Sequence, residues 1–263
     1  MSPGGRRIKA LETAFEILAV LKENGQMSLA ELSEQVDVTK GTAHTHLMTL
    51  QQNDLVEQAG ERYRLGTGFI TYGAHVKNRQ LVFQAGKDPV RQLALKTGEI
   101  CEIATEYDGK CVLLHRFYGE NTINREYQQT SFEQHRYLHY GATGKSMLAQ
   151  MSPERVDRIV DRYGLPAQTN KTITDRGTLF DELERIRERG YAYNDEEEIH
   201  GIRAVGTPIL STDGDCLGAI CVAGPGGRID DEQFTEAFPN LVAEARSLIE
   251  ANVQTNDFDV FTN

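Results

Sequence analysis

The sequence predicts an α+β protein in which an N-terminal winged helix-turn-helix precedes a linker helix and a larger C-terminal domain. Three observations support this: two amphipathic helices joined by a short turn, a strand hairpin directly after them, and an irregular mixture of strands and helices in the second half. That irregular order favours an α+β domain over a doubly wound sheet. The expected boundaries are 1–67 for the winged helix-turn-helix, 68–86 for the linker helix, 87–254 for the C-terminal domain and 255–263 for a tail.

Hydrophobic spacing and capping residues predict the three helices of the first domain. Apolar residues recur at helical spacing over Ala10 to Lys22 and predict the first helix. Ser28 is a typical N-cap for the second helix, and Thr39 for the third. The third helix has a buried stripe formed by Ala43, Leu47 and Leu50. The short turn between the last two helices is typical of a helix-turn-helix.

Two short strands and one apolar segment follow the third helix. The strands, 55–58 and 62–65, flank a glycine-containing turn and predict a wing. The mixed apolar segment 69–84 predicts the linker helix, which we expect Gly86 and Pro89 to end.

The C-terminal domain is expected to contain two strand pairs and three helices. The strand pairs are 100–107 with 111–117 and 204–210 with 217–223. A proline at the start and a glycine just past the end predict a helix from Pro153 to Tyr163. The other helices are expected at 179–189 and 233–253, the second interrupted or offset at Pro239.

Composition indicates an ordinary globular protein, with 39% hydrophobic and 25% charged residues. No apolar run approaches the length of a membrane span, so we expect a cytoplasmic protein without a membrane partner. Four cysteines without a C-x-x-C pair favour reduced thiols and indicate neither a metal nor a cofactor. The net charge is -11, with 9 lysines and 19 arginines, which fits a salt-rich cytoplasm such as a halophilic archaeon's or simply an acidic protein.

Four stretches of the chain carry motifs in a defined order. They are E-R-Y-R-L-G at Glu61–Gly66, H-Y-G-A-T-G-K-S-M-L-A at His139–Ala149, G-Y-A-Y-N-D-E-E-E-I-H-G at Gly190–Gly201, and L-G-A-I-C-V-A-G-P at Leu217–Pro225. Together they resemble the isocitrate lyase regulator (IclR) family of transcription regulators over nearly the whole chain. The resemblance implies a GAF-like effector-binding domain, a double-stranded DNA operator and a small-molecule effector as partners, and a homodimer or a dimer of dimers.

The candidate DNA-reading residues lie on the third helix and in the wing. We expect Thr42, His44 and Thr45 to contact base edges and Lys40 to contact a phosphate. Arg62 and Arg64 share one face of the wing strand and could reach phosphates or a minor groove. The alternatives are an inert exposed helix surface and arginines paired with Glu57 and Glu61.

Two features weaken the expectation of DNA binding. The family often has an arginine at the position of Thr45, and its loss removes a reader of guanine. Residues 1–66 hold seven Lys and Arg against nine Asp and Glu, whereas a DNA-binding domain is normally basic. High intracellular salt would reconcile this charge with DNA binding, because phosphate contacts then gain little from counterion release.

The resemblance also implies an effector pocket. Mapped by motif, its residues are Leu138, Gly141, Ala142, Asn194, Ala204, Cys221 and Ala223. The alternative is that the small residues only pack a core, that Asn194 only forms a turn, and that the run from Asp195 to Glu198 is a solvated face.

Differences from the family predict the kind of effector. Family members that bind small oxoacids commonly have an Asp, a Cys and two Ser at the positions of Asn194, Ala204, Cys221 and Ala223. We therefore expect weak binding of glyoxylate and pyruvate, and a larger, less charged, sugar-derived or aromatic ligand. In this prediction Asn194 is both donor and acceptor for the ligand.

Two rival functions stay open at this point. One is a Cys/His enzyme or metal site, although no local signature supports it and G-A-T-G-K lacks P-loop spacing. Its candidate residues would be His115, His135, His139 and His200 with Cys111 or Cys221. The other is a structural DNA-binding dimer that has no effector.

Overall fold

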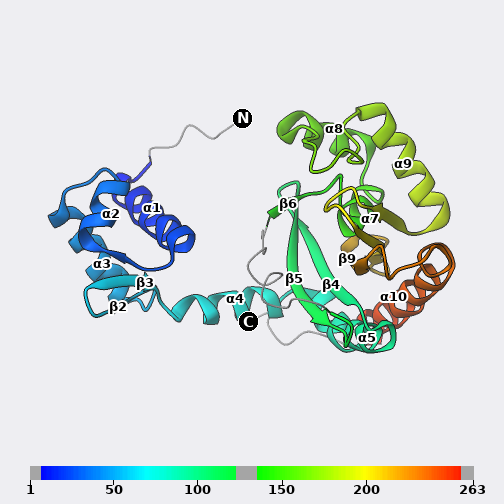
Figure 1. Cartoon of the computed structure of the whole chain (residues 1–263), viewed down its shortest axis with the longest axis horizontal. Coiled ribbons are helices and arrows are strands. Elements are labelled where there is room, and N and C mark those ends of the chain that lie inside the picture. The colour runs from blue at the N-terminus through cyan, green and yellow to red at the C-terminus, as the bar shows by residue number, and fades with distance from the viewer. Residues whose placement is uncertain (1–6, 123–134, 256–263) are drawn as a thin grey trace. The chain divides into compact units, whose positions relative to one another are not determined.

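The computed structural model describes residues 7–122 and 135–255, which belong to two compact units, Met1–Lys77 and Asn78–Asn263 (Figure 1). Of the expected tail at 255–263, all but Thr255 lies outside the described residues.

The first unit is a winged helix-turn-helix, as the sequence predicts. Its elements are α1 (Lys9–Asn24), β1 (Met27–Ser28), α2 (Leu29–Gln35), α3 (Lys40–Gln52), β2 (Val56–Ala59), β3 (Arg62–Leu65) and most of α4 (Gly68–Asn78). Ser28 and Glu31 form a reciprocal capping box at the start of α2, and Thr39 Oγ1 accepts a hydrogen bond from Thr42 N at 3.1 Å. The strand β1, which the sequence analysis did not predict, extends the wing to a sheet of order β1-β3-β2.

The expected single linker helix at 68–86 is wrong, because this segment contains α4 and the first part of α5 (Leu81–Thr97). Gly86 and Pro89 lie inside α5 and do not end it. Gly86 packs directly on the sheet, because a Cβ there would lie in ordinary contact with Ile103 Cδ1, at 3.4 Å. Pro89 has no N–H to donate to the carbonyl of Ala85, and Asn252 Nδ2 from α10 donates to that oxygen instead, at 3.0 Å.

The second unit is built on a six-stranded antiparallel sheet of order β6-β5-β4-β9-β8-β7. The strands are β4 (Ile100–Tyr107), β5 (Lys110–Tyr118), β6 (His135–Tyr137), β7 (Ala192–Asp195), β8 (Ile202–Leu210) and β9 (Cys216–Pro225). Both expected strand pairs are present, whereas β6 and β7 were not predicted. The unit confirms the expected α+β class.

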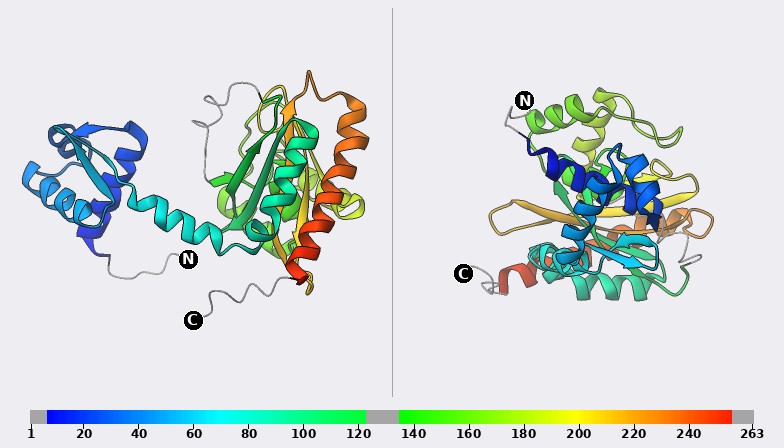
Figure 2. Two further views of the ribbon diagram at one scale, coloured as in Figure 1. Left: turned by 90° about the horizontal axis from the view of Figure 1, so that it is seen from below. Right: turned by 90° about the vertical axis from the view of Figure 1, so that its left-hand side faces the viewer.

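Helices cover both faces of this sheet. One face packs against α5 and α10 (Phe238–Thr255), which run side by side (Figure 2). The other face carries α7 (Ala142–Leu148), α8 (Pro153–Tyr163) and α9 (Arg176–Arg189) (Figure 1). The offset expected near Pro239 is a π-helical turn, Gln233–Ala237, directly before α10. Pro239 follows this turn within a continuous run of helical residues, so the π-helical turn lies where the missing N–H of Pro239 interrupts regular α-helical hydrogen bonding.

Side chains along the central strands alternate between the two faces of the sheet. Ile220 and Val222 of β9 belong to the core beneath α5 and α10, whereas Cys221 and Ala223 face the opposite side. Glu102 alternates in the same way between the core residues Cys101 and Ile103. Small and polar side chains therefore gather on the face that carries α7.

Candidate functional site

The four helix residues expected to read DNA are all exposed on α3. Lys40, Thr42, His44 and Thr45 face solvent, while the expected stripe on the other side is buried. Thr42 Oγ1 lies 2.9 Å from Thr39 Oγ1, and Thr45 Oγ1 donates to the carbonyl of Gly41 at 3.0 Å. Both hydroxyl oxygens keep acceptor capacity for a base edge.

The two wing arginines are exposed but already have partners. Arg62 donates to the carbonyl oxygen of Gln26 at 2.8 Å and pairs with Glu31 at 3.1 Å. Arg64 pairs with Glu57, as one of the sequence alternatives anticipated. A phosphate would therefore compete with these carboxylates for the guanidinium N–H groups.

A cavity of about 270 Å³ lies on the face of the second unit that carries α7. Five of the seven residues expected at an effector site line it, namely Ala142, Asn194, Ala204, Cys221 and Ala223. Other apolar lining comes from Ile100, Leu113, Ile199, Ile202 and Pro225. The cavity is near the lower end of the usual size for small-molecule sites, which suits a small metabolite.

The other two expected residues do not line the cavity. Leu138 is buried in the core formed with α7, α8 and α9. Gly141 lies next to Glu198, which lines the cavity: a Cβ on Gly141 would be 3.2 Å from Glu198 Oε2. Gly141 therefore leaves room for the Glu198 carboxylate.

Four charged residues form a network at the cavity that the sequence analysis missed. Glu102 accepts from Arg116 Nε at 2.8 Å and from Arg136 Nη2 at 2.9 Å. Arg136 Nη1 donates to Glu198 Oε1 at 2.9 Å. Because the partners lie on β4, β5, β6 and the segment after β7, the network links four parts of the cavity wall.

The charges of this network keep Glu102 ionised although it is only 5% exposed. Burial by itself raises the pKa of Glu102, but the charges of Arg136 and Arg116 and their hydrogen bonds lower it to about 2. Burial likewise lowers the pKa of Arg136, and the carboxylates of Glu102 and Glu198 raise it above its usual value.

Asn194, which is expected to be both donor and acceptor for a ligand, lines the cavity and also makes hydrogen bonds within the protein. Its Oδ1 accepts from Glu197 N at 2.9 Å and from Glu198 N at 3.4 Å. Its Nδ2 points to Glu198 Oε2, also at 3.4 Å. An aspartate at this position would repel the Glu198 carboxylate, so the amide at 194 and the carboxylate at 198 fit each other.

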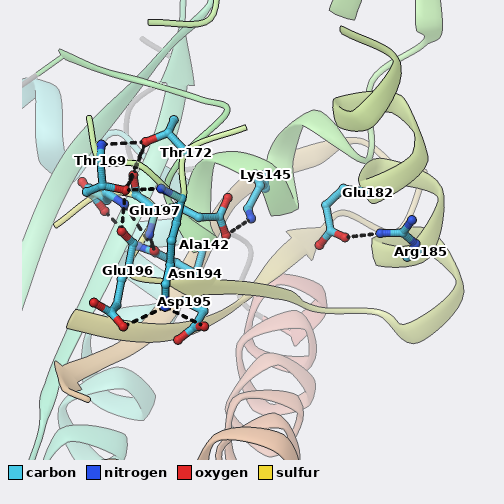
Figure 3. A network of polar contacts seen from close by, with 12 residues as sticks. Ala142, Lys145, Thr169, Thr172, Glu182, Arg185, Asn194, Asp195, Glu196 and Glu197 are labelled. Carbon is cyan, nitrogen blue, oxygen red and sulfur yellow. Dashed lines mark hydrogen bonds and ion pairs between the residues drawn. The ribbon is translucent and has the colours of Figure 1, made fainter. Parts of the chain in front are cut away.

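The acidic run Asp195 to Glu198 is not simply a solvated face. Glu197 is buried against Lys145 of α7, whose side chain is 1% exposed (Figure 3). Thr172 Oγ1 donates to the carbonyl of Glu197 at 2.6 Å, and Thr169 Oγ1 to that of Glu196 at 2.8 Å. These contacts fix the backbone that presents Glu198 to the cavity.

The cysteines and histidines of the rival enzyme hypothesis lie in environments that do not favour catalysis. Burial raises the pKa of Cys111 and of Cys221, which opposes the thiolate form that a nucleophile needs. His115 packs edge-on against Phe117, with ring centroids 4.5 Å apart, and His139 Nε2 lies 3.1 Å from the carbonyl of Pro166. His200 is exposed, and the side chain of His135 lies outside the description. Within 7–122 and 135–255 no cluster of His, Cys, Asp or Glu could hold a metal ion.

No helix among the described residues is long and apolar enough to cross a membrane.

The fold and the two candidate sites are those of a transcription regulator with a separate ligand-sized cavity. Residues 10–60 match the IclR helix-turn-helix domain, and residues 74–250 match the C-terminal domain of the bacterial transcriptional regulator IclR. The chain belongs to the IclR family of helix-turn-helix transcription regulators.

Individual relatives agree with this assignment along almost the full length. The chain is 35% identical over 251 residues to the probable HTH-type transcriptional regulator ArcR of Halobacterium salinarum, which covers 95% of each chain. It is 27% identical to the transcriptional repressor IclR of Escherichia coli, over 94% of this chain and 91% of the repressor.

Solved structures share the fold. The Thermotoga maritima IclR structure has a TM-score of 0.79 and 27% identity, covering 94% of this chain and 99% of that one. An IclR homologue of Microbacterium hydrocarbonoxydans, complexed with 4-hydroxybenzoate, has a TM-score of 0.79 at 16% identity, covering 94% of this chain and 100% of that one. The second likeness supports the fold alone.

Proposed function

We propose that this regulator binds an operator through its first unit and that a small metabolite in the cavity of its second unit controls the affinity. The observation that carries the proposal is the cavity of about 270 Å³. Five of the seven motif-mapped residues line it, and its backbone is held by Asn194 and the Lys145–Glu197 pair. A structural neighbour with the same fold was solved in complex with 4-hydroxybenzoate, so the fold is compatible with a bound small molecule.

The operator-reading surface in this proposal is the exposed face of α3 with the wing. Thr42, His44 and Thr45 read bases, and Lys40 binds a phosphate. The wing residues Arg62 and Arg64 bind phosphates in competition with their carboxylate partners. The division of roles follows the expected domains, with DNA binding in 1–67 and effector binding in 87–254. The protein acts in the cytoplasm, where an operator is accessible.

A homodimer is part of the proposal. Leu11 and Phe15 on α1 are 54% and 67% exposed, and Tyr72 and Val76 on α4 are 63% and 59% exposed. Exposed large apolar side chains on neighbouring turns are typical of association surfaces. Two copies related by a two-fold axis would bind an inverted repeat. Light scattering at working concentration should give a dimer or larger, and a monomer bound to one half-site would contradict this part.

A mobility-shift experiment with a metabolite panel tests the proposal and its rivals. A regulator changes its affinity for operator DNA when one class of metabolite is added. A structural DNA-binding protein keeps the same affinity with every compound, and an enzyme consumes a compound in the absence of DNA. The operator fragment is obtained by genome-wide mapping of bound DNA, whose neighbouring genes also indicate the pathway.

A further inference from the structure

The charged side chains that line the cavity balance one another. Among the described lining residues, the carboxylates and guanidiniums are equal in number: Glu99, Glu102 and Glu198 against Arg116, Arg136 and Arg228. Glu99 takes two hydrogen bonds from Arg228, and Glu102 and Glu198 share the other two arginines. An occupant with a net charge would leave one buried charge without compensation, which is costly at low dielectric.

Two polar atoms of the network can each form a further hydrogen bond. Arg136 Nε is buried and has no hydrogen-bond partner in the described structure. Among the described residues, Glu198 Oε2 has only the 3.4 Å contact from Asn194 Nδ2, while its other oxygen accepts from Arg136. One bonded pair of side chains thus offers a charged donor and a charged acceptor. A buried donor without a partner costs free energy that a ligand can recover.

We propose that the effector is a small zwitterion, an α-amino acid with an apolar side chain. Its carboxylate accepts from Arg136 Nε, its ammonium donates to Glu198 Oε2, and its side chain packs against Leu113, Ile202 and Ala204. Such a ligand satisfies both open positions and keeps the cavity neutral. This inference rests on the proposed function, because it identifies the ligand of the same cavity.

The charge balance also explains why simpler acids and amines should bind less well. A carboxylate without an ammonium would bring a negative charge next to Glu198 and to Glu102, whose pKa of about 2 keeps it ionised at neutral pH. An amine without a carboxylate would leave Arg136 Nε without a partner and add a positive charge. Each analogue therefore loses one charge-assisted hydrogen bond as well as neutrality.

Calorimetry on the full-length protein tests the inference with matched compounds. The probes are L-leucine and L-phenylalanine. Their comparators lack one charged group each: 4-methylpentanoate and 3-phenylpropanoate lack the ammonium, while 3-methylbutylamine and 2-phenylethylamine lack the carboxylate. We expect at least one amino acid to bind about tenfold to hundredfold more tightly than both of its comparators, the usual range for one charge-assisted hydrogen bond.

The variant Glu198→Gln distinguishes a direct contact between Glu198 and the ligand's ammonium from a general loss of folding. Removing this carboxylate leaves the cavity with one excess positive charge, so the preference should reverse toward the acid that lacks the ammonium. Glu196→Gln is the matched control, because Glu196 belongs to the same acidic run but does not line the cavity. It should keep the preference for the amino acid. A melting curve of each variant shows whether it folds.

The outcomes distinguish this inference from the proposed function. If neither amino acid binds at millimolar concentration, or if a comparator acid binds the unmodified protein as tightly as its amino acid, the inference is wrong. In that case release of operator DNA by some other metabolite would still support the proposed function. If Glu198→Gln retains the preference for the zwitterion, the assigned contact with the ammonium is wrong.

Discussion

The two units use the same kind of ion pair in opposite surroundings. In the DNA-binding unit, Arg62 and Glu31 are 47% and 48% exposed. In the cavity unit, Lys145 and Glu197 are 1% and 11% exposed. An exposed pair is screened by water and salt and exchanges partners at little cost, whereas a buried pair fixes geometry because neither charge can be left alone. The exposed arginine of the wing can therefore bind a DNA phosphate, whereas the buried ion pair near the cavity fixes the shape of the cavity.

Breaking one ion pair in each unit should lower the free energy of unfolding far more in the cavity unit than in the DNA-binding unit. Lys145→Met leaves the Glu197 carboxylate buried without its partner, and we expect the free energy of unfolding to fall by about 3–5 kcal/mol. Arg62→Met removes an exposed pair and a backbone contact, and should cost about 1 kcal/mol. Urea unfolding of both variants measures this. Equal losses would show that burial does not distinguish the two units.

The double change Lys145→Met with Glu197→Leu is the control for the buried pair. Replacing both charges with apolar side chains removes the unpaired carboxylate, so most of the lost stability should return. If the double variant were as unstable as Lys145→Met, the loss would come from packing rather than from charge.

Acid should weaken the cavity unit through Glu102. Its pKa is lowered from 4.5 to about 2 in the folded protein, so the stability it contributes is complete above about pH 4.5 and is lost as the pH falls toward 2. The contribution is about 3 kcal/mol. The difference in unfolding free energy between the unmodified protein and Glu102→Gln should therefore shrink over this pH range. A constant difference from neutral pH down to pH 2 would contradict the lowered pKa.

In the DNA-binding unit, substitutions on α3 should change the sequence preference, whereas substitutions in the wing should change the affinity for all sequences. Thr45→Ala and His44→Ala should change which sequences are bound, with losses of about 1–3 kcal/mol at particular base pairs. Arg62→Ala should weaken binding to all sequences alike, because a phosphate contact carries no sequence information. Binding to a randomised operator library measures both effects. A shifted preference from Arg62→Ala with silent α3 variants would place the reading face elsewhere.

The smallest expected effect concerns the second pair in the wing. Glu57→Gln releases Arg64 from its carboxylate partner, which should raise the affinity for any DNA by less than tenfold. If Arg64 then gains a phosphate contact, the slope of log affinity against log salt should steepen by about one. An unchanged slope would mean that Arg64 does not reach the DNA backbone.

Local signals in the sequence were sufficient for elements whose ends are set by neighbouring residues. Pro153 and Gly164 mark the start and end of α8, and Ser28 and Thr39 mark the helices of the DNA-binding unit. The same signals failed at Pro89, because the hydrogen bond that compensates for it comes from Asn252, far away in the chain. A tertiary contact of this kind has no local signature.

The charged network of the cavity was missed for a related reason. The turn at Asp108 and Gly109 pairs Tyr107 with Lys110, and an unbroken register from there would place Glu102 opposite His115. A bulge after Ile103 shifts the register by one residue and places Glu102 opposite Arg116. A glutamate between buried apolar residues was the one available signal, since an ionised side chain there needs a cationic partner.

Control of operator binding by an occupant of the cavity is tested most directly by filling the cavity. Ala204→Leu adds an apolar side chain to the lining, and Ala251→Leu, on the exposed side of α10, is the matched control. Fluorescence anisotropy measures the affinity for a labelled operator fragment, with and without the panel metabolite that has the largest effect on the unmodified protein. We expect Ala204→Leu to bind the operator normally and lose the response, while Ala251→Leu keeps both. A full metabolite response in Ala204→Leu would contradict control through this cavity.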